Sequence, residues 1–319
     1  MATSPNPFLE SLPRPTKTYH STTYDRISTH HGFDGTGKTV LITGGSMGIG
    51  LSIAKAFARA GAARIALLSR SLPAQQTAKA ELEAAHPGTA ILLYQDSVSD
   101  YVRFESILEE LEAVDVLVLC AAVYHARVPA TTLRLMDVRH AFDLNAISAF
   151  ILGRAYLKAR MPAVASKTLI HLASAAAQMR APWRSAYGAS KAAAVHAMRH
   201  LALEHAAGAE QPPAMNTGPD PGPDPDTEHE AETGLCPARV FSFHPGVIYT
   251  PGSADVFEQD AMHWEDPRLP ADFALWLAGP ESDFLSGRYV WANWDVDELI
   301  ALKDAMARDE RLLTLGLVV

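Results

Sequence analysis

The sequence predicts a single doubly wound α/β domain, built on a parallel sheet of about seven strands with helices on both faces. Two observations lead to this fold class. Short, almost wholly apolar runs of strand length alternate with longer amphipathic stretches, and the runs lack the in–out alternation of a half-exposed sheet. Ligands of such domains bind beyond the carboxyl ends of the strands, so the residues after each run are the candidates for a site.

The elements follow one another in the order that parallel pairing requires, with a crossover between successive strands. The strand-sized runs are 38–43, 63–69, 90–95, 114–120, 167–173 and 238–243, with a seventh at 287–292. Helical patterns cover 73–86, 100–113, 133–161 and 185–207, and a further helix begins near Ile49.

Three regions flank or interrupt this pattern. We expect residues 1–35, which are polar and turn-rich, to form a surface arm, residues 36–294 to form the catalytic domain, and residues 295–319 to form a helical tail. Residues 208–237 hold seven acidic side chains, seven of the 21 prolines and no Lys or Arg. Such a composition buries too little apolar surface to offset its ordering entropy, so we expect a mobile insertion within the domain.

The composition excludes several classes of protein. The chain has 319 residues, is 48% hydrophobic and 20% charged, and carries a net charge of −9, which argues against a nucleic-acid partner. There is no apolar run of membrane-spanning length and no secretory signal, so we expect no membrane partner. Two cysteines, Cys120 and Cys236, form no disulfide framework and fit a reducing, cytoplasmic location.

The first strand runs directly into TGGSMGIG, residues 43–50. Glycines between a strand and a helix let backbone N–H groups approach a pyrophosphate, and the helix N-terminus favours negative charge. We expect this loop to bind a dinucleotide, the alternative being a tight turn without a ligand. The predicted contacts are Thr43, Gly44, Ser46, Gly48, Ile49 and Gly50.

The next two strand ends predict the choice of cofactor. The second strand ends in Ser69 and Arg70, where an NAD site usually has a carboxylate for the ribose hydroxyls. An arginine there favours a 2′-phosphate, and hence NADP, although an exposed surface arginine is the alternative. The third strand leads to Asp96 and Ser97, which we expect near the adenine, unless Asp96 is a helix cap.

A phenol and an ammonium lie one turn apart in SAYGASKAAA, at Tyr187 and Lys191. Residues four apart share a helix face. A free tyrosine has a pKa near 10, and we expect the nearby ammonium to lower it, so that the phenol can give a proton to a carbonyl oxygen.

These motifs together resemble the classical short-chain dehydrogenase/reductase family and its Rossmann-like fold. TGGSMGIG matches TGxxxGxG, and YGASK matches YxxxK. Ser174 lies 13 residues before Tyr187, Asn145 matches the asparagine of the fourth helix, and HPGVIYT at 244–250 matches the PGxxxT segment. The N-terminal arm and the ending RYVWANWDVDEL are similar to fungal members found with secondary-metabolism genes.

The resemblance implies the remaining site residues. Asn145, Ser174, Tyr187 and Lys191 would form the catalytic set, in which Ser174 holds the substrate oxygen and Asn145 supports a proton relay through Lys191. Further cofactor contacts would come from Asn145, Tyr187 and Lys191 of this set and from Ala121, Ala122, Pro245, Val247 and Thr250. The usual NNAG motif is here LCAA, which removes the asparagine hydrogen bonds.

The predicted activity is NADP-dependent interconversion of a carbonyl and a secondary alcohol on a small, polyketide-like molecule, in a homo-oligomer. An NAD-linked alcohol dehydrogenase, an isomerase, dehydratase or cyclase with the same acid–base pair, and a nucleotide-binding scaffold are the alternatives. We expect no metal: His196 and His200 are one turn apart, but the glutamate of HExxH is absent. Met179, Trp183 and Trp264 line an apolar pocket or pack in the core, and Cys120 is expected to be a packing residue.

Overall fold

The computed structural model describes residues 14–28, 32–160, 166–209, 236–254 and 257–316. Its centre is one parallel sheet of seven strands in the order β3-β2-β1-β4-β5-β6-β7, which confirms the predicted fold class. The strands are β1 Thr39–Thr43, β2 Arg64–Ser69, β3 Ala90–Gln95, β4 Val116–Leu119, β5 Lys167–Leu172, β6 Ala238–His244 and β7 Tyr289–Trp291.

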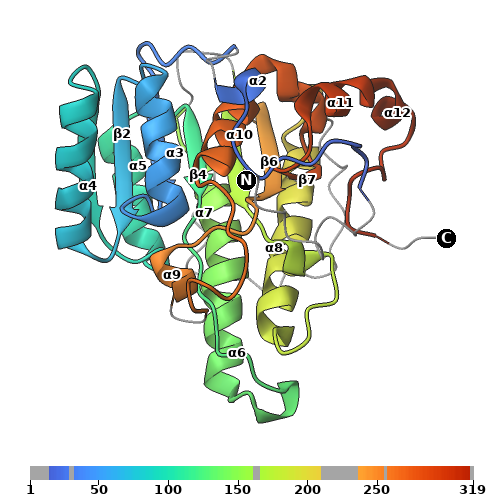
Figure 1. The fold of residues 1–319 in the computed structure, drawn as a ribbon. Helices are drawn as coiled ribbons and strands as arrows, with labels where there is room; N and C mark the ends of the chain where they lie inside the picture. Colours follow the sequence, from blue (N-terminus) through green and yellow to red (C-terminus); the bar gives the residue numbers. More distant parts are fainter. Residues whose placement is uncertain (1–13, 29–31, 161–165, 210–235, 255–256, 317–319) are drawn as a thin grey trace, which may run out of the picture.

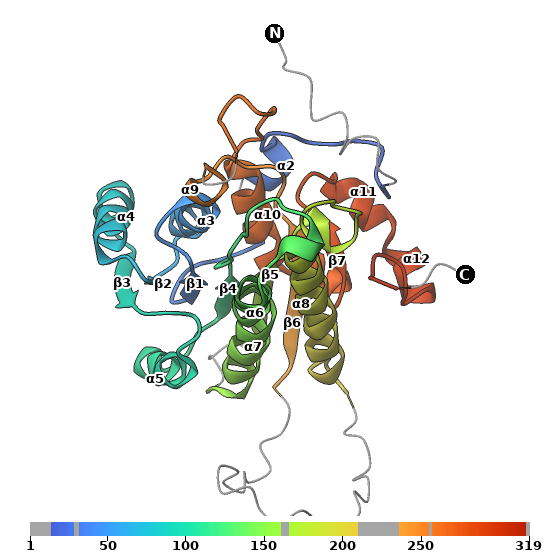
Figure 2. The ribbon, with the colours of Figure 1, turned by 90° about the horizontal axis from the view of Figure 1, so that it is seen from below.

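Helices cover both faces of the sheet (Figures 1 and 2). One face packs against α3 Gly48–Arg59, α4 Leu72–Ala85 and α10 Arg268–Ala278. The other packs against α5 Tyr101–Leu111, α7 Ser148–Lys158 and α8 Ser185–Glu204. Each face has its own apolar core, and the central strands are fully buried.

The predicted helix at 133–161 is interrupted. It consists of α6 Leu135–Phe142, one π-helical turn Asp143–Ile147, and α7. π-Helical turns inside α-helices are frequent at functional sites, and this one contains the buried Asn145.

The described N-terminal segment and the C-terminal helices lie side by side on the α10 side of the sheet. The short helices α2 Asp25–Ser28, α11 Val296–Ala301 and α12 Lys303–Arg308 lie there, whereas α9 Pro251–Ala254 follows β6. Glu298 accepts hydrogen bonds from the backbone N–H groups of Lys17 and Thr18, and Ile27 is buried. Residues 14–28 are therefore bound to the rest of the fold through named contacts.

The acidic insertion predicted at 208–237 lies almost wholly outside the described residues. Its two described flanks are joined: His205 Nδ1 lies 2.9 Å from the carbonyl oxygen of Cys236, and Ala238 N–H donates to His205 O at 2.9 Å. The insertion therefore leaves and re-enters the fold at one point. In the described part of the chain no helix is long and apolar enough to cross a membrane.

Candidate active site

The glycine loop packs tightly between two neighbouring segments. Gly44 and Gly48 have φ of 68° and 55°, a backbone region that L side chains rarely adopt. A Cβ atom on Gly50 would lie 2.2 Å from the carbonyl oxygen of Gly44, and one on Gly48 would lie 3.1 Å from Thr250. Met47 gives no side-chain cap to α3. The loop thus presents backbone to the outside at a helix N-terminus, which fits a pyrophosphate.

The end of β2 lies beside this loop. The Ser69 hydroxyl donates to the Ser46 hydroxyl at 2.9 Å, so the two predicted contacts are adjacent. Arg70 is exposed, and its guanidinium has no hydrogen-bond or ion-pair partner in the described residues. It is therefore free to bind an anion brought to this strand end.

The end of β3 completes the expected nucleotide-binding edge. Asp96 N–H donates to Ser69 O at 3.1 Å, and Ser97 N–H donates to the Asp96 carboxylate at 2.7 Å. The helix-cap alternative for Asp96 is wrong, because Asp100 is the N-cap of α5 and accepts from Arg103 N–H at 3.0 Å.

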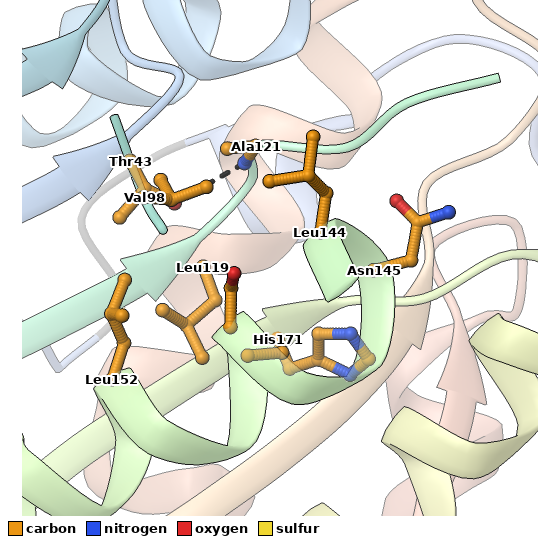
Figure 3. A pocket seen from close by; sticks show the side chains of 10 residues that line it. Thr43, Val98, Leu119, Ala121, Leu144, Asn145, Leu152 and His171 are labelled. Atoms are coloured by element: carbon orange, nitrogen blue, oxygen red, sulfur yellow. Dashed lines mark hydrogen bonds between the residues drawn. The ribbon is translucent and has the colours of Figure 1, made fainter. Parts of the chain in front are cut away.

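Thr43 holds the backbone that follows β4, where the asparagines of the NNAG motif are absent. Its hydroxyl oxygen accepts from the N–H groups of Cys120 and Ala121 at 3.0 and 3.2 Å, the latter drawn in Figure 3. Ala121 lies against Gly44, and Ala122 is exposed. Burial raises the pKa of the Cys120 thiol to about 12, so it is held as an unreactive thiol.

A small pocket lies on the α7 side of this strand end (Figure 3). Its wall is mostly apolar and is formed by Thr43, Val98, Leu119, Ala121, Leu144, Asn145, Ser148, Ala149, Leu152 and His171. It adjoins Asn145 but contains neither the phenol nor the ammonium. The pocket therefore lies beside Asn145 and does not include Tyr187 or Lys191.

The four predicted catalytic residues come together at the carboxyl ends of β4 and β5. The Asn145 carboxamide accepts a hydrogen bond from Val123 N–H at 2.9 Å and donates one to Val123 O at 3.0 Å. It also donates to the Ser190 hydroxyl at 3.1 Å. Ser190 in turn donates to Tyr187 O at 2.8 Å. Asn145 thus ties the loop after β4 to the helix that carries the phenol.

Ser174 and Lys191 approach Tyr187 from two sides. Ser174 follows β5, and its hydroxyl accepts from Ala176 N–H at 3.2 Å. It also lowers the pKa of the buried phenol, against the rise that burial and Tyr124 cause. The Lys191 ammonium lies one turn along α8 and donates to Leu172 O at 2.7 Å. The phenol and the amine are thus both buried along α8, and the half-buried Ser174 faces them from the end of β5.

The expected lowering of the Tyr187 pKa by Lys191 is wrong for the protein groups alone. Burial raises the pKa of Tyr187 well above 10, Tyr124 raises it further, and the cation that opposes this rise is Arg184. The pKa of Lys191 is itself lowered to about 8, because its ammonium is desolvated. The sequence reasoning counted the attraction between the two groups but not the burial of both.

Sequence reasoning missed three residues beside the phenol. The Tyr124 ring stacks on the Tyr187 ring with centroids 4.8 Å apart. His125 Nε2 accepts from Tyr187 N–H at 3.0 Å, while its Nδ1 lies 2.7 Å from Ala126 O. The third is Arg184, directly before α8. The run YHAR after the β4 strand end was the available signal for Tyr124 and His125, since such positions face a site. No such signal pointed to Arg184.

The segment after β6 is held by a buried carboxylate that was also missed. Glu265 accepts from Val247 N–H at 2.6 Å, from Asn293 at 3.0 Å and from Tyr19 at 3.0 Å. Pro245 precedes Gly246, whose φ is 92°, and a Cβ there would lie 2.4 Å from Glu265. The predicted contacts Pro245, Val247 and Thr250 are thus fixed beside the glycine loop.

The other candidates have packing or surface roles in the structure. His196 and His200 are exposed, with their Nε2 atoms 3.3 Å apart, and the described residues contain no group of three or more His, Cys, Asp or Glu arranged to hold a metal ion. Met179 packs against the core, Trp183 is 52% exposed, and Trp264 contacts the rings of Tyr249 and Phe257.

Comparison with known proteins agrees with this geometry. Residues 38–210 match the family model described as short chain dehydrogenase. A short chain dehydrogenase/reductase of Claviceps purpurea is 60% identical over 98% of this chain and 97% of its own length. One of Aspergillus aculeatus is 53% identical over 97% and 99%. A Burkholderia cenocepacia short chain dehydrogenase, solved in complex with NADP, superposes with a TM-score of 0.61 and 21% identity, over 80% of this chain and 96% of that one.

Proposed function

Because the chain belongs to the short-chain dehydrogenase/reductase family, we propose that it is an NADP-dependent oxidoreductase that interconverts a carbonyl and a secondary alcohol. Membership makes it an oxidoreductase with a nicotinamide cofactor. The preference for NADP, the reaction and the substrate class are the finer parts of the proposal. The observation that carries it is the convergence of Ser174, Tyr187 and Lys191 beside a glycine loop that fits a dinucleotide.

The cofactor would lie along the carboxyl ends of β1 to β4. The backbone of 44–50 would bind its pyrophosphate, Asp96 and Ser97 would border its adenine, and Arg70 with Ser69 would bind a 2′-phosphate. Pro245, Val247 and Thr250 would border the nicotinamide. When bound, the nicotinamide would supply the hydride. The NADP complex of the Burkholderia relative supports the choice of NADP for this chain.

The chain's own residues would handle the proton. Ser174 would donate a hydrogen bond to the carbonyl oxygen and hold it beside Tyr187, whose phenol would give the proton. The raised pKa keeps the phenol protonated before the transfer, but it also makes the phenol a weaker acid. Lys191 would pass a replacement proton to the phenol, and Asn145 would hold the surrounding loop and helix together. A general acid in this position contributes roughly 10²- to 10⁴-fold.

We further propose a small organic substrate from fungal secondary metabolism, with a polyketide-like ketone as the first choice, and assembly into a homo-oligomer. The likeness to fungal relatives supports the first statement. Light scattering of the purified chain tests the second.

The test is a panel of aromatic and aliphatic ketones and aldehydes with NADPH and with NADH, followed by absorbance and by mass analysis of the product. Consumption of NADPH with formation of the alcohol supports the proposal. A product of unchanged oxidation level, formed without net NADPH consumption, supports isomerisation, dehydration or cyclisation instead. Tight NADPH binding without any product supports a scaffold.

A further inference from the structure

A buried arginine lies one ring away from the phenol of Tyr187. Arg184 is only 8% exposed. Its guanidinium carbon lies 5.6 Å from the ring centre of Tyr124 and 5.2 Å from that of Phe257. The Tyr124 ring stacks on Tyr187. A full positive charge is therefore held at the edge of the proposed substrate position.

This charge has no carboxylate partner among the described residues. Arg184 donates from Nη1 to His125 O at 3.2 Å, which uses one of its five N–H donors. Two partly buried arginines do have a carboxylate, since Arg239 pairs with Asp283 at 2.8 Å and Arg26 with Asp297 at 2.8 Å. Arg288 has none, but it donates to four backbone carbonyl groups, whereas Arg184 donates to one. A buried charge without a counter-charge is costly, so a ligand that supplies the negative charge accounts for its retention.

A second cation extends the same positive region. Arg127 is exposed, and its guanidinium carbon lies 5.6 Å from the Phe257 ring. Burial lowers the pKa of Arg184, and the like charge of Arg127 lowers it further. An anion between or beside them would relieve the repulsion between these like charges.

The chain is strained at the residue that precedes Arg184. Trp183 has φ of 70°, a left-handed conformation that costs a non-glycine residue about 1 kcal/mol or more. Its own side chain is 52% exposed, so the strain does not serve to bury the indole. The turn instead precedes the inward-facing Arg184.

From these observations, and resting on the proposed reductase function, we infer that the substrate is an aromatic carbonyl compound that carries a delocalised oxyanion. Arg184 and Arg127 bind the anion, and the rings of Tyr124 and Phe257 border the aromatic group beside it. A guanidinium matches a carboxylate through paired N–H donors and also binds an ionised phenol. A carboxylate and an ionised phenol are both recognised by this chemistry, and the two arms of the test distinguish between them.

The test measures binding to the full chain saturated with NADP⁺, by titration calorimetry. The carboxylate arm compares 2-naphthoate with 2-naphthamide. The phenolate arm compares 4-nitrophenol, at a pH where it is ionised, with 4-nitroanisole. We expect the anion to bind at least about 10-fold more tightly than its neutral analogue in one arm, since hydrogen bonds to charged groups are worth that much.

Three variants locate the effect. Arg184→Met should reduce the anion preference by about 10- to 100-fold, and Arg184→Lys should restore part of it. Arg180→Met is the matched control, because Arg180 is an exposed arginine in the same connection before α8, and it should keep the preference. Arg127→Met, at an exposed position, should reduce the preference by a smaller factor and tests the site without disturbing a buried side chain.

Equal affinities for anion and neutral analogue in both arms would overturn the inference, as would an anion preference that survives in both Arg184→Met and Arg127→Met. These are binding measurements, so they are independent of turnover. An arginine-dependent anion preference without reduction of any carbonyl would overturn the proposed function and leave the anion site standing. Reduction of neutral ketones without such a preference would overturn the anion site and leave the proposed function standing.

Discussion

The imidazole Nε2 of His125 accepts a 3.0 Å hydrogen bond from the backbone N–H of Tyr187. With Nδ1 directed at Ala126 O, the ring is the neutral tautomer with its proton on Nδ1. Tyr187 lies in the first turn of α8, whose N-cap residue Arg184 gives no side-chain cap. His125 therefore satisfies an N–H group that a helix leaves free, and it fixes the start of the helix that carries the phenol.

Replacing His125 should disturb the phenol more than the fold. We expect His125→Ala to cost about 1 kcal/mol of stability, as loss of a helix cap does, and to lower kcat with little change in NADPH affinity. His125→Gln can still accept the hydrogen bond and should recover part of kcat. Thermal unfolding, kcat and the NADPH dissociation constant check this. An unchanged kcat in His125→Ala would show that the contact is incidental.

The stability contributed by Lys191 should depend on pH. Its pKa is about 8 in the folded protein and about 10.4 in an unfolded chain. Between these two pH values the side chain is mostly protonated only in the unfolded chain. The free energy of unfolding of the wild type therefore rises with pH in this range, and Lys191→Met removes this rise. The variant should therefore lose about 2 kcal/mol relative to wild type between roughly pH 7 and pH 9.5.

Urea unfolding of both proteins near these two pH values measures that difference. Because all other titrating groups are shared, they cancel in the comparison. The Lys191–Leu172 hydrogen bond shifts the absolute difference but not its change with pH. A difference that is the same at both pH values would contradict a desolvated Lys191.

The choice of cofactor should depend mainly on Arg70, since Met47 offers no second cation in the glycine loop. Arg70→Ala should weaken NADPH by about 10- to 150-fold, the range for a charge-assisted hydrogen bond, and leave NADH nearly unchanged. Adding Ser69→Asp should shift the preference towards NADH, by repelling the phosphate and binding the ribose hydroxyls. The dissociation constants of both cofactors measure this. A wild type that prefers NADH, or an equal loss for both cofactors, would exclude this role.

The acidic insertion should be dispensable for the fold. Its flanks are joined at His205 and Cys236, so a short connection can span them. We expect replacement of residues 210–235 by a short Gly/Ser linker to leave solubility and NADPH affinity unchanged, because loop length contributes little to stability. Loss of soluble protein, or protection of this segment from protease in the wild type, would contradict the expectation.

The sequence predicted the strands and the grouping of the catalytic set because both follow from local pattern. Each apolar run became a parallel strand, and the loops that follow β4 and β5 bring Asn145, Ser174 and Tyr187 to one edge. The π turn at Asp143–Ile147 was not predicted, because the sequence from 133 to 161 was interpreted as one continuous helix. α10 was missed because its residues after Arg268 are all buried, so it has no polar face to set against an apolar one.

The environment of the site depends on contacts that no spacing reveals. Glu265 and Tyr19 are far apart in the chain, yet both are bonded at the segment after β6. The raised pKa of Tyr187 results first from burial and then from the neighbouring Tyr124, whereas the sequence displayed only Lys191. A local motif identifies which groups meet, but the desolvation of those groups depends on the whole fold.

The most direct measurement of the account compares Tyr187→Phe with wild type, using a ketone that wild type reduces. The variant keeps the buried ring and its stacking on Tyr124 but has no proton to give. We predict that kcat falls by at least about 10²-fold, while the NADPH dissociation constant stays within about threefold of wild type. A variant that reduces the ketone at a near-normal rate would contradict the assignment of Tyr187 as the acid, and with it the proposed mechanism.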